Sequence, residues 1–328
     1  MNDLVLHSLS ELLPCEVRRG ELRRGSRTLR WVEAGQGSPA VVCEAALGEP
    51  GSLTYAGVIP ATAARTRIIA YDRAGLGASD PVPDLALHTQ IEDLAAVASQ
   101  AGEPCVLAGH SWGGLLVLLV AAKHPELVAG LVLVDPADEV YWASLPPEIH
   151  QQNVEMGAMI MEQYASGELP EEIRRSVRGY VERLTDSERV RALIFDAFVS
   201  CYALHSQAAM MPTESDLFEN SVPLIHSIRQ SAPLPDVPIV VLSATTGTSP
   251  DIRERYTGVH ADLVASVARG THIVLPETGH AINEERPEAI AEAIDQVLDE
   301  IEGSRSVGGQ VAGGSGHGLT AQQPRRPG

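Results

Sequence analysis

The chain has 328 residues, 44% of them hydrophobic, and 24 Lys+Arg against 43 Asp+Glu give a formal net charge of −19. This charge would repel a nucleic-acid backbone or an anionic membrane, and no apolar run approaches the roughly 20 residues of a transmembrane helix, so we expect neither partner. The N-terminus, with Asp3, lacks the features of a secretory signal, and the four cysteines lack CxxC spacing, which predicts a cytoplasmic protein with free thiols.

The first expected element is a β-hairpin over residues 15–34, where side chains alternate on either side of a Gly25-Ser26 turn. Six short, continuously apolar runs follow it. Runs of this kind are typical of strands that are buried on both faces of a parallel sheet. They cover residues 40–45, 67–72, 105–110, 130–135, 238–244 and 271–277.

Helical patterns separate several of these runs, at residues 88–102, 112–125 and 286–301. The second ends at Pro125, and the third opens with Pro287 near its first turn. Because strands and helices alternate, we predict an α/β fold with a doubly wound, mostly parallel sheet.

One long segment interrupts this alternation. Residues 136–235 lack a buried-strand pattern, and their helical stretches lie near 147–165, 170–185, 187–206 and 214–230. A structureless loop of this length is uncommon in a compact domain, which favours an inserted helical subdomain. The predicted core is then 1–135 with 236–302. Residues 303–328 have almost no large apolar side chains and are expected to be disordered.

The segment Gly109-His110-Ser111-Trp112-Gly113 has the Gly-x-Ser-x-Gly pattern and lies where a buried strand meets an apolar helix. In this context the pattern predicts a nucleophile elbow, a tight turn that lifts the serine hydroxyl above the sheet. The glycines would make room for the turn, and Trp112 would offer its backbone N–H to an oxyanion at the positive end of the helix.

A nucleophilic serine needs a base, and His280 is the candidate. It lies in a Gly-His pair between the last predicted strand and the C-terminal helix, so it follows the serine in the chain order typical of this fold. His110, beside the serine, is expected to line the substrate pocket.

At these residues the chain resembles the α/β-hydrolase superfamily. The resemblance covers about 35–135 and 235–302, and it rests on four motifs. They are "YDRAGLGASDP" at 71–81, "GHSWGG" at 109–114, "LVLVDPAD" at 131–138 and "ETGH" at 277–280. The resemblance implies a helical cap over the active site, for which residues 136–235 are suitable, with Trp142 as a pocket residue.

The second oxyanion donor departs from the pattern of many relatives, which have His-Gly after the first core strand. Ala45-Ala46 stands there in this chain. Leu47 is the best match for the backbone donor, or Ala46 if the alignment shifts by one residue.

The catalytic acid also departs from the pattern. Relatives usually place it shortly after the strand that follows the cap, where this chain has Gly247, and the next carboxylate is Asp251. Other relatives use an acid after the strand that follows the nucleophile helix, where this chain has Asp135. Asp135 is the preferred acid and Asp251 the alternative; Asp138, or no acid, stays open.

The resemblance implies a serine hydrolase that cleaves a carboxylic ester, lactone or thioester of a small to medium apolar substrate through an acyl-serine, without a metal or cofactor. Two alternatives are a prolyl-aminopeptidase-like peptidase and a non-hydrolytic or ligand-binding protein such as a cyclase. Epoxide and haloalkane hydrolysis are disfavoured because those chemistries use an aspartate in place of Ser111. The expected partner is a small-molecule substrate, and a homodimer stays open.

Overall fold

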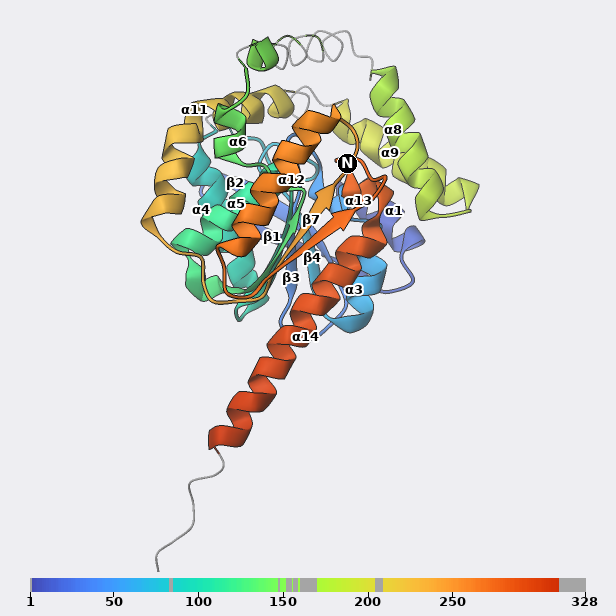
Figure 1. Ribbon diagram of the computed structural model, residues 1–328. Helices are drawn as coiled ribbons and strands as arrows, with labels where there is room; N and C mark the ends of the chain where they lie inside the picture. The colour runs from blue at the N-terminus through green and yellow to red at the C-terminus, as the bar shows by residue number, and fades with distance from the viewer. Residues whose placement is uncertain are drawn as a thin grey trace, which may run out of the picture.

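The fold is built on one mixed sheet (Figure 1). The computed structural model describes residues 2–82, 85–146, 148–151, 155, 159, 170–203 and 209–312. Within them, eight strands have the order β1-β2-β4-β3-β5-β6-β7-β8. The strands are β1 (Val17–Arg24), β2 (Arg27–Ala34), β3 (Val41–Glu44), β4 (Ile68–Asp72), β5 (Cys105–His110), β6 (Val128–Val134), β7 (Ile239–Ala244) and β8 (Gly270–Leu275).

The predicted hairpin is confirmed. Strands β1 and β2 pair antiparallel, from Val17 opposite Ala34 to Arg24 opposite Arg27. Strand β2 also pairs antiparallel with β4, which attaches the hairpin to the sheet. From β4 to β8 all neighbouring strands are parallel, as the apolar runs predicted.

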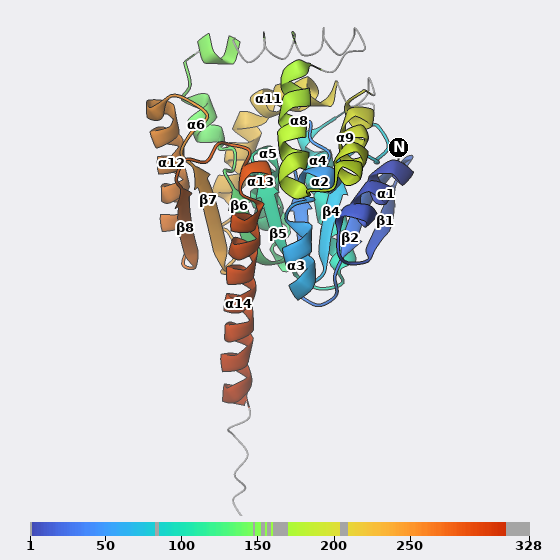
Figure 2. The same ribbon diagram turned by 90° about the vertical axis from the view of Figure 1, so that its right-hand side faces the viewer.

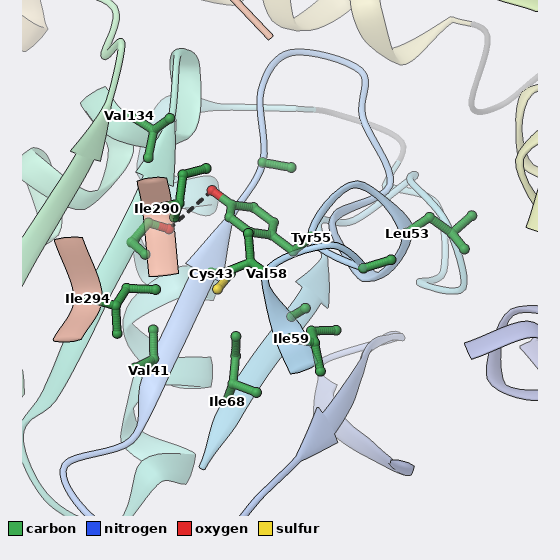
Figure 3. Close-up of a cluster of buried hydrophobic side chains, with 14 of the residues drawn as sticks. Val41, Cys43, Leu53, Tyr55, Val58, Ile59, Ile68, Val134, Ile290 and Ile294 are labelled. Atoms are coloured by element: carbon green, nitrogen blue, oxygen red, sulfur yellow. Dashed lines mark hydrogen bonds between the residues drawn. The ribbon is translucent and has the colours of Figure 1, made fainter. Parts of the chain in front are cut away.

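The central strands bury both faces because successive side chains point to opposite sides of a sheet. Val41 and Cys43 belong to one hydrophobic cluster, whereas Val42 belongs to the other. Figure 3 shows the first cluster, in which Tyr55 packs beside β3. The Tyr55 hydroxyl also donates a hydrogen bond to the carbonyl oxygen of Glu44 at 3.0 Å. These two layers fix the strand ends that carry the site.

Helices cover both faces (Figures 1 and 2). Residues of α1, α3 and α14 contribute to the first cluster, and residues of α4, α5 and α12 contribute to the second. These helices are α1 (Asn2–Leu12), α3 (Ile59–Arg65), α4 (Leu87–Ala98), α5 (Trp112–Lys123), α12 (Pro250–Ala265) and α14 (Pro287–Ala312). The short helices are α2 (Gly51–Thr54), η1 (Ser99–Ala101), η2 (Pro125–Leu127) and α13 (Ile282–Glu285).

Between β6 and β7 the described residues form helices and no strand. The helices are α6 (Glu139–Ala143), α8 (Glu171–Leu184), α9 (Glu188–Tyr202) and α11 (Met210–Ser231). Figure 2 shows them beyond one end of the sheet. Three of the four helical predictions fall on α8, α9 and α11, while most of the predicted helix at 147–165 lies outside the described residues.

Two local predictions differ from the structure. Strand β8 is the last strand of the sheet, so it lacks a neighbour on one side, and Val274 on it is 46% exposed instead of buried. The disordered tail stays a prediction, and α14 continues past its expected start at residue 303 to Ala312. Residues 303–312 contain no proline to stop a helix that has already formed. Residues 313–328 lie outside the described residues.

Among the helices that the structure describes, none combines the length and the apolar character required to cross a bilayer.

Candidate active site

Ser111 lies at the junction of β5 and α5, where the sequence predicts an elbow. Its φ of 53° and ψ of −116° are strained for a non-glycine residue. The backbone is held because the Ser111 N–H donates to the Val134 carbonyl at 3.0 Å, and the Ser111 carbonyl accepts from Ala137 N–H at 2.9 Å. The neighbouring strand β6 and the residues after it therefore fix the turn.

The glycines of the elbow are required by close backbone contacts. A Cβ on Gly109 would lie 2.4 Å from the carbonyl oxygen of Gly113. A Cβ on Gly113 would lie 2.4 Å from the carbonyl oxygen of Glu44. Any side chain at either position would force the strand and helix apart.

His280 pairs with Asp135. The His280 Nδ1–H donates to Asp135 Oδ2 at 2.6 Å, which leaves Nε2 as the basic nitrogen. Asp135 is fully buried directly after β6. Its φ of 42° is positive, so its backbone is strained, like that of Ser111. Strain of this kind persists where the surrounding structure imposes it, and it gathers at functional sites.

Two further groups donate to the Asp135 carboxylate. Arg253 Nη1 lies 2.9 and 2.8 Å from its two oxygens, and the Ala244 N–H lies 3.1 Å from Oδ1. Burial would raise the pKa of this carboxyl, but the hydrogen bond from His280 and the charges of His280 and Arg253 outweigh burial and hold the pKa well below its usual range. Asp135 is therefore ionised at any working pH.

Among the described residues, no hydrogen bond or ion pair joins the alternative acid to His280. Asp251 is exposed in the first turn of α12, and Asp135 is the carboxylate that accepts from His280. Gly247, at the position where relatives carry the acid, has a φ of 95°, and a Cβ built on it would lie 3.6 Å from the His280 backbone nitrogen. Gly247 therefore lies next to His280 but has no carboxylate. The carboxylate that contacts His280 comes from Asp135, directly after β6.

A cavity of about 460 Å³ brings the predicted residues together. Ser111, His280, Leu47, Trp112 and Trp142 all line it. The remaining lining residues come from the loop after β6, from α6 and α11, and from the β7–α12 region. They are Ala137, Asp138, Tyr141, Phe218, Gly247, Thr248, Ile252, Arg253 and Tyr256.

The indole ring and the backbone N–H of Trp112 have different surroundings. Its ring is fully buried, packs 5.2 Å from Phe218 and donates from Nε1 to Gln90 Oε1 at 3.1 Å. Its backbone N–H is the first of α5, and the first N–H groups of a helix have no partner within the helix. This N–H is one candidate oxyanion donor, and the N–H of Leu47, which also lines the cavity, is the other.

His110 is not among the described residues that line this cavity, which corrects the expectation from sequence. It ends the buried strand β5, and its ring centre lies 4.9 Å from that of His280. His110 Nε2–H donates to the His280 carbonyl oxygen at 2.8 Å, and burial lowers the pKa of His110 to about 3. The ring is neutral and supports the backbone of the His280 loop.

Glu49 lies behind His110, with Oε2 4.0 Å from His110 Nδ1. Burial, followed by the charge of Glu284, raises the pKa of Glu49 to about 8. The folded protein therefore takes up a proton at Glu49 that the unfolded chain releases near pH 4.5.

The Glu49→Gln variant is expected to have a larger free energy of unfolding than the wild type at pH 8, and a similar one at pH 4. The raised pKa means that the wild type loses stability as the pH rises from 4.5 towards 8, whereas the amide has no proton to lose. The gain is on the order of 2 kcal/mol, since one pKa unit corresponds to about 1.4 kcal/mol and the side chain keeps some access to water. Urea unfolding at both pH values measures it.

The exposed Glu16→Gln variant is the control for that experiment and should follow the wild-type curve. If Glu49→Gln and wild type keep a constant difference from pH 4 to pH 8, Glu49 is not protonated in the folded protein.

Sequence reasoning missed Arg253 and Glu49. Arg253 lies one helical turn into α12, with no motif that links it to Asp135, 118 residues earlier. Glu49 stands in the "LGEPGS" loop, where the sequence indicates a solvated glutamate. Its proximity to the buried His110 appears only in three dimensions. In the part of the chain that the structure describes, no three His, Cys, Asp or Glu side chains gather as a metal site.

A model of the alpha/beta hydrolase family matches residues 48–293. One curated relative is the cis-3-alkyl-4-alkyloxetan-2-one decarboxylase of Shewanella oneidensis, 31% identical over 134 residues. That match covers 39% of this chain but only 41% of the relative's length. The haloalkane dehalogenase of Mycolicibacterium smegmatis is 27% identical over 272 residues, which are 77% of this chain and 83% of that enzyme.

The arrangement of the chain is also found in solved structures. The epoxide hydrolase CorEH superposes with a TM-score of 0.63 at 19% identity, and the match covers 87% of this chain and all of that one. At this identity the likeness concerns the fold alone. The family model matches most of the length of the chain, and the chain therefore belongs to the alpha/beta hydrolase family.

Proposed function

We propose that this protein is a serine hydrolase that cleaves a carboxylic ester, lactone or thioester through an acyl-serine intermediate. The observation that carries the proposal is the 2.6 Å hydrogen bond from His280 to buried Asp135, in the same cavity as Ser111 on its strained turn. Serine at the elbow favours acyl transfer, because its oxygen attacks a carbonyl carbon, the leaving group of the substrate departs, and the acyl-serine ester that results can be cleaved by water.

The steps follow from the atoms present. His280 Nε2 takes the proton of Ser111 as Oγ attacks the carbonyl carbon of the substrate. The N–H groups of Leu47 and Trp112 stabilise the oxyanion. His280 then protonates the leaving group, and water, activated by the same nitrogen, releases the acid product. Asp135 holds the tautomer of His280 and stabilises its positive charge.

The cavity supports a small to medium apolar substrate. Its volume of about 460 Å³ lies within the usual range for small-molecule sites. Much of its wall is apolar, with Leu47, Trp142, Phe218 and Ile252 among the lining residues. Since α6 contributes Trp142 and α11 contributes Phe218, we propose that residues 136–235 act as the cap that selects the substrate.

Labelling of the intact protein with a fluorophosphonate tests the reaction class. The reagent phosphonylates only an activated serine, so mass spectrometry should place one adduct on Ser111. Hydrolysis of p-nitrophenyl acyl esters of increasing chain length is measured in parallel, with proline p-nitroanilide as the amide.

Ester turnover together with labelling supports the proposal, and faster release from the anilide would instead indicate a peptidase. A folded protein that neither labels nor turns over any of these substrates contradicts a hydrolytic role and points to a ligand-binding or non-hydrolytic member of the family.

Replacing Arg253 with methionine is expected to lower kcat on the ester by about 10-fold, with little change in KM. Arg253 Nη1 donates to both Asp135 oxygens, and methionine leaves the carboxylate free to turn away from His280 Nδ1. His260, whose charge also acts on Asp135, stays unchanged. Steady-state kinetics with equal concentrations of folded protein measures the effect.

Arg255→Met removes an exposed charge from the same helix and serves as the control. Equal kcat for both variants and wild type would show that Arg253 does not position Asp135.

A further inference from the structure

Arg73, directly after β4, is the centre of a buried network. Its side chain is 2% exposed. Nη1 donates to Glu44 Oε1 and to the Ala45 carbonyl, both at 2.6 Å. Nη2 donates to the Ala46 carbonyl at 2.6 Å. Nε and Nη2 also donate to the two carboxylate oxygens of Glu214, at 2.7 and 2.8 Å.

These contacts hold the peptide that carries the proposed oxyanion donor. A trans peptide is planar, with its C=O and N–H pointing in opposite directions. Arg73 binds the Ala46 carbonyl, so the N–H of Leu47, in the same peptide, is directed to the opposite side. The next peptide is held too, since the Gly48 N–H donates to Glu214 Oε2 at 2.8 Å. Both peptides that flank the Leu47 side chain are therefore fixed.

Glu214 connects this loop to the nucleophile side of the cavity. Its Oε1 also accepts from Gln90 Nε2 at 2.6 Å, and Gln90 Oε1 accepts from the indole of Trp112. Four N–H groups thus converge on one carboxylate, which uses all of its acceptor sites. One residue of α11 is linked to both proposed oxyanion donors.

The helix is pressed against the loop as well as bonded to it. Gly48 has a φ of 69°, and a Cβ there would lie 2.5 Å from the Cβ of Met211 on α11. Glu44 and Glu214 are fully buried, and a buried ion pair is often no more stabilising than apolar side chains of similar volume. A gain in stability therefore does not explain why the network is present. Its geometry, however, gives the Leu47 N–H a defined direction.

We propose that Arg73 and Glu214 are positioning residues that orient the Leu47 N–H of the oxyanion hole, so that the hole is complete only when α11 is docked on the loop after β3. This inference rests on the proposed serine hydrolase function. It makes the inserted helical segment part of the catalytic geometry in addition to its contribution to the cavity wall.

Two variants test the inference. Glu214→Gln keeps the shape of the side chain but turns an NH₂ towards two of the four donors. Arg73→Lys keeps the charge, but one ammonium cannot reproduce the planar fork that holds both carbonyls. Asp216→Asn, exposed on the same helix, removes a carboxylate without touching the loop and is the control.

The measurement compares a p-nitrophenyl ester with its thionoester, in which sulfur replaces the carbonyl oxygen. A hole shaped for an oxyanion discriminates against the larger and weaker acceptor sulfur. For both variants we expect an approximately 10²-fold fall in kcat on the oxygen ester with little change in KM, and a fall of about 10-fold or more in the oxygen-to-sulfur rate ratio. A general loss of folded protein lowers both rates equally and leaves the ratio unchanged.

If wild type turns the ester over, Ser111→Ala does not, and the ratio is unchanged in both variants, the inference is overturned while the proposed function stands. If wild type turns over no ester, the proposed function fails, and crystal structures of the variants decide the inference. A rotated Ala46–Leu47 peptide supports it, and an unchanged peptide overturns it.

Discussion

Replacing Ser111 with alanine is expected to lower ester turnover by about 10⁶-fold and to abolish fluorophosphonate labelling. Alanine fits the elbow sterically and keeps the backbone contacts of Ser111 with Val134 and Ala137, so the cavity should persist. What is lost is the nucleophile, and with it the covalent intermediate. The initial rate of p-nitrophenolate release at saturating ester, corrected for the uncatalysed rate, measures the effect.

The control for Ser111→Ala is Ser10→Ala, an exposed serine on α1 that should keep full activity. If Ser111→Ala retains more than about one part in 10³ of the wild-type kcat, another group or an activated water attacks the substrate, and the acyl-serine mechanism is wrong.

Asp135→Asn is expected to reduce kcat by about 10⁴-fold. Three donors surround Asp135: Ala244 N–H and Arg253 at Oδ1, and Arg253 and His280 at Oδ2. The amide oxygen is best placed on the Oδ1 side, which turns the NH₂ towards His280 Nδ1. His280 must then carry its proton on Nε2, where it cannot accept the proton of Ser111. Steady-state kinetics on the same ester measures the loss.

Asp251→Asn is the matched control for that variant, because the same substitution is made at an exposed aspartate in the alternative position. We expect wild-type kcat from it. A larger loss from Asp251→Asn than from Asp135→Asn would reverse the assignment of the acid and imply that the β7–α12 loop moves towards His280.

Much of the fold could be predicted because its signals are local. Continuous apolar runs marked β3 to β7, and alternation around Gly25-Ser26 marked the hairpin. The pattern could not show that β8 is an edge strand, since strand order is a property of the whole sheet. It also gave no sign that the backbone after Gly303 is helical, because low apolar content concerns packing and not the continuation of an existing helix.

The candidate site was predictable where one short segment carries the chemistry. Gly-x-Ser-x-Gly placed Ser111, and a carboxylate directly after a buried strand marked Asp135. His110 is not among the residues that line the cavity, because its buried ring bonds to the backbone of His280 instead. Arg73 and Glu214 are separated by 141 residues, so no spacing rule could link them to Leu47.

Gly247 has a consequence for how this protein could change its substrate. In the proposed assignment β6 supplies the acid, so the loop after β7 has no catalytic side chain to keep in place. Gly247, Thr248, Ile252 and Tyr256 from this region nevertheless line the cavity. Mutations there can reshape the wall next to His280 while Ser111 and Asp135 keep their positions. Directed evolution towards new acyl groups should therefore begin at Thr248 and Ile252 and leave Arg253, which donates to Asp135, unchanged.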